Sequence, residues 1–171
     1  MKAVYSRKPN RCASWDYSNN GKYFITICTE QRKCILGKGI VGDGVLDVPR
    51  VELTENGKLC VKHIEEMNSI YSDIQTEKFI VMPNHVHMII TIDKSQGTSR
   101  TPSPTNELIP RYISTLKRLT NKDFGENVWE RSYHDHIIRS DDEYSKIWQY
   151  IDSNAVKWQN DCFYTEQEVK P

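Results

Sequence analysis

The sequence between residues 85 and 92 constrains the fold more than any other part of the chain. Successive side chains of a β-strand point to opposite faces of the sheet. One face of this run carries only apolar side chains: Val86, Met88, Ile90 and Ile92. The opposite face begins with His85 and His87. We therefore expect a strand that buries one face in a hydrophobic core and starts its other face with two imidazoles.

The neighbouring segments predict further strands. β-Branched and aromatic residues favour strands over 23–28 and 79–82, and Pro83 and Asn84 favour a tight turn before a strand over 86–92. A short strand is expected over 136–139. A turn and a weak hairpin are indicated by the glycines at positions 37, 39, 42 and 44.

Three helices are expected between these strands. Apolar residues recur at helical spacing over 52–67, where Gly57 falls on the apolar stripe and permits close packing, and over 109–119. Ser140 and Glu143 form a capping box, in which Glu143 reaches back to the helix start, and the helix it opens extends to about Trp158. Strands and helices in this order predict an α+β protein, with helices packed on an antiparallel sheet.

The chain has 171 residues, which suits one domain over 1–171. We expect an N-terminal arm over 1–20, a mobile polar loop over 94–104 and a C-terminal tail over 159–171. Five cysteines without CxxC spacing and no signal peptide favour reduced thiols in the cytoplasm. No run is long enough to span a membrane.

Positive charge gathers in two stretches although the formal net charge is zero. Residues 1–15 and 108–122 contain no acidic residue. The basic residues that we single out there are Arg7, Lys8, Arg11, Arg111, Lys117 and Arg118. They form either a phosphate-binding surface or two solvated faces, and charge alone does not decide between these alternatives.

His85 and His87 are spaced to chelate one metal ion, because side chains two residues apart on a strand lie on one face. The alternative is a pair of partly exposed histidines near a turn. A second pair, His134 and His136, flanks Asp135 but has no strong apolar run behind it. We expect His134 to lie at the surface and His136 to have a supporting or structural role.

The third expected helix carries a tyrosine and an asparagine on one face. Tyr150 and Asn154 are four residues apart, at the edge of the apolar stripe, and Lys146 lies one turn earlier. The alternative is an amphipathic helix whose tyrosine shields the edge of the core. Taken with the histidine pair, the spacing suggests one mechanism: the carbonyl oxygen of Asn154 is a third ligand to Mg²⁺ or Mn²⁺.

A cation held there would polarise a phosphate for attack by Tyr150. A phenol is a weak nucleophile at neutral pH, since its reference pKa is about 10. We expect Lys146 to favour the phenolate. A Lys146→Met substitution should then change the rate of single-strand cleavage when that rate is measured over a range of pH values.

In its ordered set of motifs the chain resembles the single-tyrosine HUH transposases, which are IS200-like, and among them the REP-associated tyrosine transposases. The resemblance covers most of the chain. The matching segments are 15–17, 21–29, 53–57, 82–88, 108–117, 128–131, 133–139 and 149–154, with Trp158. The chain departs from the family pattern at Ala155, where proline is frequent, and at His134, where tyrosine is frequent.

The resemblance implies a ferredoxin-like antiparallel sheet flanked by helices. It implies cleavage of single-stranded DNA by Tyr150, which leaves a 5′-phosphotyrosine and a free 3′-hydroxyl. It places Asn154 as the third metal ligand and a short DNA hairpin with a nearby tetranucleotide as the target. Either a monomer or a homodimer is compatible with these expectations.

Single-strand binding needs a basic groove and stacking aromatics, for which Trp15, Tyr17 and Trp129 are candidates, although packing is the better explanation for Trp129. Two other functions compete with a transposase. One is a domesticated protein that binds hairpin DNA or RNA without cutting. The other is a metal-dependent phosphodiesterase that uses water, whose activity would survive Tyr150→Phe.

Overall fold

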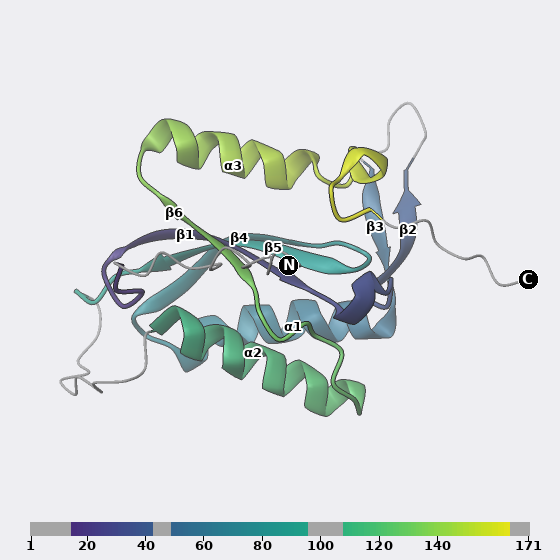
Figure 1. Cartoon of the computed structure of the whole chain (residues 1–171), viewed down its shortest axis with the longest axis horizontal. Coiled ribbons are helices and arrows are strands. Elements are labelled where there is room, and N and C mark those ends of the chain that lie inside the picture. The colour runs from purple at the N-terminus through teal and green to yellow at the C-terminus, as the bar shows by residue number, and fades with distance from the viewer. Residues whose placement is uncertain (1–14, 43–48, 96–107, 165–171) are drawn as a thin grey trace, which may run out of the picture.

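The computed structural model of the chain describes residues 15–42, 49–95 and 108–164 (Figure 1). The basic residues Arg7, Lys8 and Arg11 lie outside these residues, as do most of the expected N-terminal arm, residues 96–104 of the polar loop and residues 165–171 of the tail. In the described part, no helix has the length and apolar character needed to cross a membrane.

The main sheet has four strands, each antiparallel to its neighbours. Their order across the sheet is β4 (Ile74–Val81), β5 (His85–Ile92), β1 (Gly21–Cys28) and β6 (His134–Ile138). The predicted glycine-rich hairpin is present as a separate pair, β2 (Gly37–Val41) and β3 (Arg50–Leu53).

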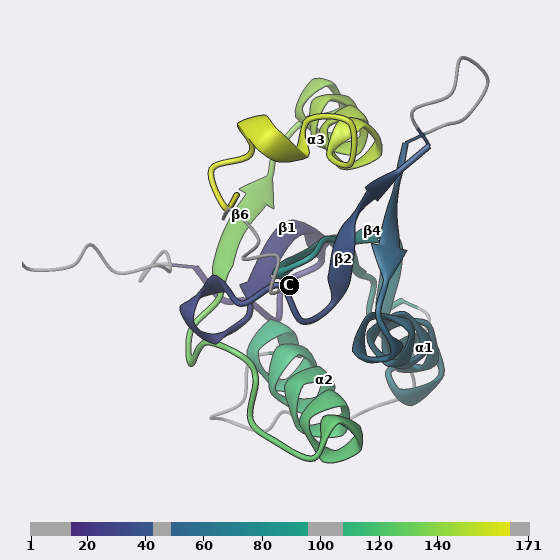
Figure 2. The same cartoon turned by 90° about the vertical axis from the view of Figure 1, so that its right-hand side faces the viewer.

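Helices cover both faces of this sheet. Helices α1 (Glu55–Ile70) and α2 (Leu108–Phe124) pack side by side on one face, and α3 (Asp141–Ser153) crosses the other (Figures 1 and 2). Without the β2–β3 hairpin, the elements follow the order β1, α1, β4, β5, α2, β6. This is the βαββαβ arrangement of ferredoxin-like folds, so the predicted α+β class and topology are confirmed.

The alternation along β5 divides the interior into two layers. Val86, Met88, Ile90 and Ile92 lie in the larger hydrophobic cluster, which fills the space between the sheet and helices α1 and α2. Ile89 lies in a smaller cluster with Ile138 and Ile151 under α3. His85 and His87 share the α3 face of β5, so the predicted separation of imidazoles from the main core is confirmed.

Two helix boundaries differ from the predictions. Helix α1 begins at Glu55 because Leu53 pairs within the β2–β3 hairpin and Thr54 caps the helix by accepting from the Gly57 backbone N–H. Helix α3 ends at Ser153, short of the predicted Trp158. The apolar stripe continues to Ala155 and Trp158, which are buried, but the chain turns there into a short 3₁₀ segment, η2 (Trp158–Asn160).

The capping box of α3 also differs in detail. Ser140 accepts from the backbone N–H of Glu143, as predicted. The Glu143 carboxylate accepts from the backbone N–H of Arg139 instead of that of Ser140, and its other oxygen contacts His136 Nε2 at 2.6 Å. His136 thus supports the start of α3.

Gly57 permits the close approach that its place on the apolar stripe predicted. A Cβ atom at this position would lie 2.0 Å from the carbonyl oxygen of Leu36. That oxygen already accepts the backbone N–H of Thr54. The backbone just before β2 therefore packs directly on α1, and any side chain at position 57 would push the two apart.

A half-buried carboxylate group connects α3 to the sheet. Glu77 on β4 accepts hydrogen bonds from Tyr144 Oη at 2.6 Å, Thr91 Oγ1 at 2.6 Å and Lys22 Nζ at 2.9 Å. Burial by itself would raise the pKa of Glu77, but these three hydrogen bonds lower it overall. Near the other end of α3, Lys78 forms an ion pair with Asp152.

We expect Tyr144→Phe to reduce the free energy of unfolding by roughly 1–2 kcal/mol at neutral pH, because a hydrogen bond to a charged group is lost. The pKa of Glu77 is lowered in the folded state. Its contribution is therefore complete above the unfolded-state pKa and is lost as pH falls through the lowered folded-state value.

Urea unfolding of parent and variant at neutral and at acidic pH tests this. The difference between the two proteins should shrink in acid. A Thr91→Val variant removes another donor to the same carboxylate. It should also be less stable than the parent at neutral pH, and by a smaller amount in acid. Equal stability of Tyr144→Phe and the parent at neutral pH would contradict the assignment.

Candidate metal and nucleophile site

His85 and His87 lie side by side at the start of β5, and both are completely buried. Their Nε2 atoms are 3.0 Å apart, and their ring centroids are 4.5 Å apart. The two rings therefore direct the same nitrogen toward one point in the layer between the sheet and α3.

The other nitrogen of each ring is held by a polar neighbour. Nδ1 of His85 lies 2.8 Å from Asn84 Oδ1, and Nδ1 of His87 lies 2.7 Å from Thr26 Oγ1 on β1. These contacts fix the ring orientations, as the outer hydrogen bonds of metal-binding histidines commonly do.

Both imidazoles are neutral at physiological pH. Burial lowers the pKa of His85 well below its ordinary range, and the nearby His87 and Arg32 lower it further. Burial lowers the pKa of His87 to about 4, although the negative charge of Asp161 partly opposes this. Neutral imidazoles are the form that binds a metal ion.

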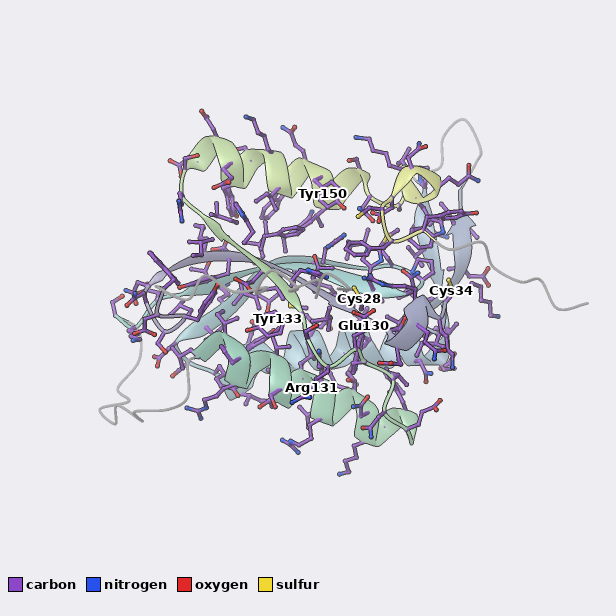
Figure 3. All side chains as sticks on the ribbon, viewed as in Figure 1. Cys28, Cys34, Glu130, Arg131, Tyr133 and Tyr150 are labelled. Carbon is purple, nitrogen blue, oxygen red and sulfur yellow. The ribbon has the colours of Figure 1, made fainter. Side chains whose placement is uncertain are left out.

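Tyr150 extends from α3 toward the histidine pair, between the helix and the sheet (Figure 3). Its hydroxyl oxygen lies 3.2 Å from His87 Nε2, and its ring packs beside that imidazole at a centroid distance of 5.2 Å. The residue as a whole remains 37% exposed, in contrast to the two buried histidines.

Asn154 follows the last residue of α3 and is buried beneath Tyr150. Its Nδ2 donates to Asp161 Oδ2 at 3.0 Å. Within the described residues, its Oδ1 is buried and has no hydrogen-bond partner. An unsatisfied buried carbonyl oxygen is costly, and a cation is one group that would satisfy it.

The structure brings in Asp161, which our sequence analysis missed. Its Oδ2 accepts from Tyr150 Oη at 3.2 Å as well as from Asn154. Its Oδ1 accepts from the backbone N–H of Phe163 at 2.7 Å. We had assigned residue 161 to a tail. The available signal was its spacing, seven residues beyond Asn154, but the chain reaches this position through a turn and η2 instead of a continuous helix.

The donor set fits a divalent cation. The ligand atoms of His85, His87 and Asp161 all lie within 4.8 Å of one another. They supply two nitrogen donors and one oxygen donor, and the side-chain amide of Asn154 contacts the same carboxylate through Nδ2. Mixed imidazole and oxygen ligation with open positions suits a catalytic metal ion.

The phenol of Tyr150 is held in its neutral form. Its pKa is raised above the ordinary tyrosine value, first by burial and then by the charge of Asp161 and the hydrogen bond to it. Lys146 is exposed on α3, and the negative charge of Asp161 acts on the phenol in the direction opposite to the one we expect of Lys146. The effect of Lys146 stays a prediction.

The second histidine pair lies at the surface. His134 and His136 are exposed on the edge strand β6, and His136 pairs with Glu143. Of the aromatic residues considered for stacking on bases, Tyr17 is buried in the core instead. Trp129 is buried and donates to Thr120 Oγ1, which agrees with the packing role favoured for it. Trp15 is half-buried and donates to Tyr23 Oη, so it too packs against the fold.

The predicted basic residues on α2 have different surroundings. Arg118 and Lys117 line a groove of about 690 Å³, together with Lys122 and Arg131. The Lys117 ammonium donates to the backbone carbonyls of Glu130 and Ser132 at 2.7 and 3.0 Å, so it also holds the segment before β6.

Arg111 is exposed on the same helix, α2, but does not line this groove. Arg131 lies across the sheet from Tyr150 (Figure 3).

Known proteins match most of this chain. The family model described as "Transposase IS200 like" matches residues 18–154. An uncharacterized protein of Haemophilus influenzae is 26% identical over 181 aligned positions, which cover 95% of this chain and 96% of that protein. The structure of a REP-associated tyrosine transposase bound to a REP hairpin matches with a TM-score of 0.59 at 19% identity, over 86% of this chain and 74% of that one, which shows a shared fold.

We expect Asp161→Asn to lower the pKa of Tyr150, because the substitution removes the negative charge beside the phenol. Burial remains, so the pKa should stay above the ordinary tyrosine value. Ultraviolet titration of this variant, with an Asp161→Asn/Tyr150→Phe double variant subtracted, isolates the one phenol. An unchanged pKa would show that Asp161 does not face the hydroxyl in solution.

Proposed function

The chain belongs to the IS200-like transposase family, and on that premise we propose that it cleaves and rejoins single-stranded DNA through a covalent bond to Tyr150. The observation that carries this proposal is the 3.2 Å separation between the Tyr150 hydroxyl and His87 Nε2. A tyrosine from α3 and an imidazole pair from β5, distant in sequence, meet at one buried point.

The cation is Mg²⁺ or Mn²⁺, and its ligands are His85, His87 and Asn154, with Asp161 as a further oxygen donor. When bound, it supplies positive charge that polarises the scissile phosphate and favours an ionised phenol. His85 and His87 need not lose a proton to bind it, because their lowered pKa values keep both neutral.

Tyr150 acts as the nucleophile. Its oxygen bonds to phosphorus, the bond from phosphorus to the 3′ oxygen breaks, and the departing oxygen takes up a proton as a 3′-hydroxyl. The phenol proton passes to Asp161 Oδ2, which already accepts its hydrogen bond. Attack by a 3′-hydroxyl on the phosphotyrosine reverses these steps and rejoins a strand.

The proposed substrate is hairpin-flanked single-stranded DNA. One relative of the same fold is bound to a REP hairpin. In this chain, the groove beside Arg118 offers positive charge for a phosphate backbone. The groove lies on the α2 side of the sheet and Tyr150 on the α3 side, so a bound hairpin would extend its single strand around the edge of the sheet to reach the hydroxyl.

The decisive variant is Tyr150→Phe. Incubation of the parent with a pool of hairpin-flanked strands and Mn²⁺ should yield a nucleotide-linked Tyr150 peptide by mass spectrometry. The variant should bind the same strands but yield no adduct and no nick. Nicking that survives in the variant would support a water-dependent phosphodiesterase. Binding by the parent without any adduct would support a domesticated binding protein.

Arg118→Ala tests the groove. Loss of one phosphate contact should weaken hairpin binding at all sequences and reduce the slope of log affinity against log salt by about one. Arg111→Ala is the matched control, because Arg111 lies on the same helix outside the groove. Equal effects of the two variants would indicate that the phosphate backbone does not follow this groove.

A further inference from the structure

Asn84 lies in the turn before β5 and is completely buried. Its backbone carbonyl accepts from the backbone N–H and the hydroxyl of Thr29 at 2.9 and 3.0 Å. A buried amide side chain in this position needs partners for both of its ends. Those partners come from three different segments of the chain.

The partners settle which end of the Asn84 amide faces His85. Nδ2 donates to the backbone carbonyl of Arg32 at 3.1 Å and to that of Phe163 at 2.9 Å. Carbonyl oxygens only accept, so the nitrogen of the amide must point to them. The oxygen therefore faces His85 Nδ1 at 2.8 Å, and Nδ1 must carry the proton in that contact.

We propose that Asn84 is a positioning residue that sets the tautomer of His85. A neutral imidazole protonated on Nδ1 has its lone pair on Nε2. That is the nitrogen directed at the candidate metal position, 3.0 Å from His87 Nε2. The inference rests on the proposed function, in which His85 is a ligand.

The opposite tautomer is costly in this surrounding. With the proton on Nε2, the lone pair of His85 Nδ1 would face a lone pair of Asn84 Oδ1 at hydrogen-bond distance. Rotation of the amide to relieve this would break both bonds to the Arg32 and Phe163 carbonyls and place oxygen against oxygen. Buried groups left without partners in this way are strongly unfavourable.

His87 differs from His85 in this respect. Its Nδ1 faces the Thr26 hydroxyl, which can donate or accept, so this partner permits either tautomer. Because His85 Nε2 has only a lone pair, His87 Nε2 is the donor in the contact between the rings. Cation binding then requires the His87 proton to move to Nδ1, where Thr26 accepts it, while His85 stays unchanged.

Nitrogen NMR of the metal-free parent tests the proposal directly. Long-range proton–nitrogen correlations separate the two imidazole tautomers and need neither cleavage nor metal. We expect His85 to be protonated at Nδ1 alone. A His85 signal from the Nε2-protonated form, or from a mixture of both, would overturn the proposal.

Two variants extend the test to the cation. Asn84→Asp keeps an acceptor for His85 but loses both donors, whereas Asn84→Ala loses the contacts to His85, Arg32 and Phe163. We expect Asn84→Ala to weaken Mn²⁺ binding, measured by electron paramagnetic resonance, by about 10- to 100-fold. Asn84→Asp should bind Mn²⁺ more tightly than Asn84→Ala, because its carboxylate still accepts from His85 Nδ1. Equal weakening in both folded variants would show that the carbonyl contacts matter and the acceptor does not.

These measurements separate the inference from the proposed function. If His85 has the expected tautomer and Mn²⁺ binds but no strand is cut, the nuclease proposal fails and the role of Asn84 stands. If strands are cut and His85 has the other tautomer, the role of Asn84 fails alone. Chemical-shift maps of the variants confirm that each retains the parent fold.

Discussion

The site depends on the packing of α3 against the face of the sheet that carries the histidines. Ile151 of the helix packs against Ile89 and Ile138 of the sheet in a small apolar cluster. Near the N-terminus of α3, Tyr144 donates a hydrogen bond to Glu77 on β4. This cluster is much smaller than the core on the other face, so polar contacts contribute a larger share of the free energy that holds α3 against the sheet. Because Tyr150 lies on the same helix, the helix position sets the distance from phenol to imidazole.

Charge at the site is arranged for a cation. Two neutral imidazoles and one carboxylate gather beside a neutral phenol. Nearby, the buried amide oxygen of Asn154 has no hydrogen-bond donor among the described residues. In the protein alone, the carboxylate of Asp161 raises the pKa of Tyr150. A divalent cation would reverse the sign of that local field, so the metal and the nucleophile are coupled through electrostatics as well as through position.

Alternation along residues 85–92 predicted the strand and the shared face of its two histidines, and helical spacing placed residues 150 and 154 on one face. Each pattern alone left a structural alternative open, and the meeting of strand and helix was predicted from the two patterns together and from the family resemblance. The sequence patterns predicted neither Asp161 nor the partners of Asn84, and the physical cause differs between the two. Asp161 arrives through a turn after α3, and no periodic pattern describes a turn. Asn84 looked like an ordinary turn residue, because its partners at residues 32 and 163 are distant in the sequence. Arg7, Lys8 and Arg11 lie outside the described residues.

Anomalous diffraction from crystals soaked in Mn²⁺ tests the central claim most directly. We predict a single strong peak between the Nε2 atoms of His85 and His87, within bonding distance of an oxygen of Asn154 or Asp161 and next to the Tyr150 hydroxyl. A peak at His134 and His136 instead, or none near the buried pair at saturating Mn²⁺, would contradict the account.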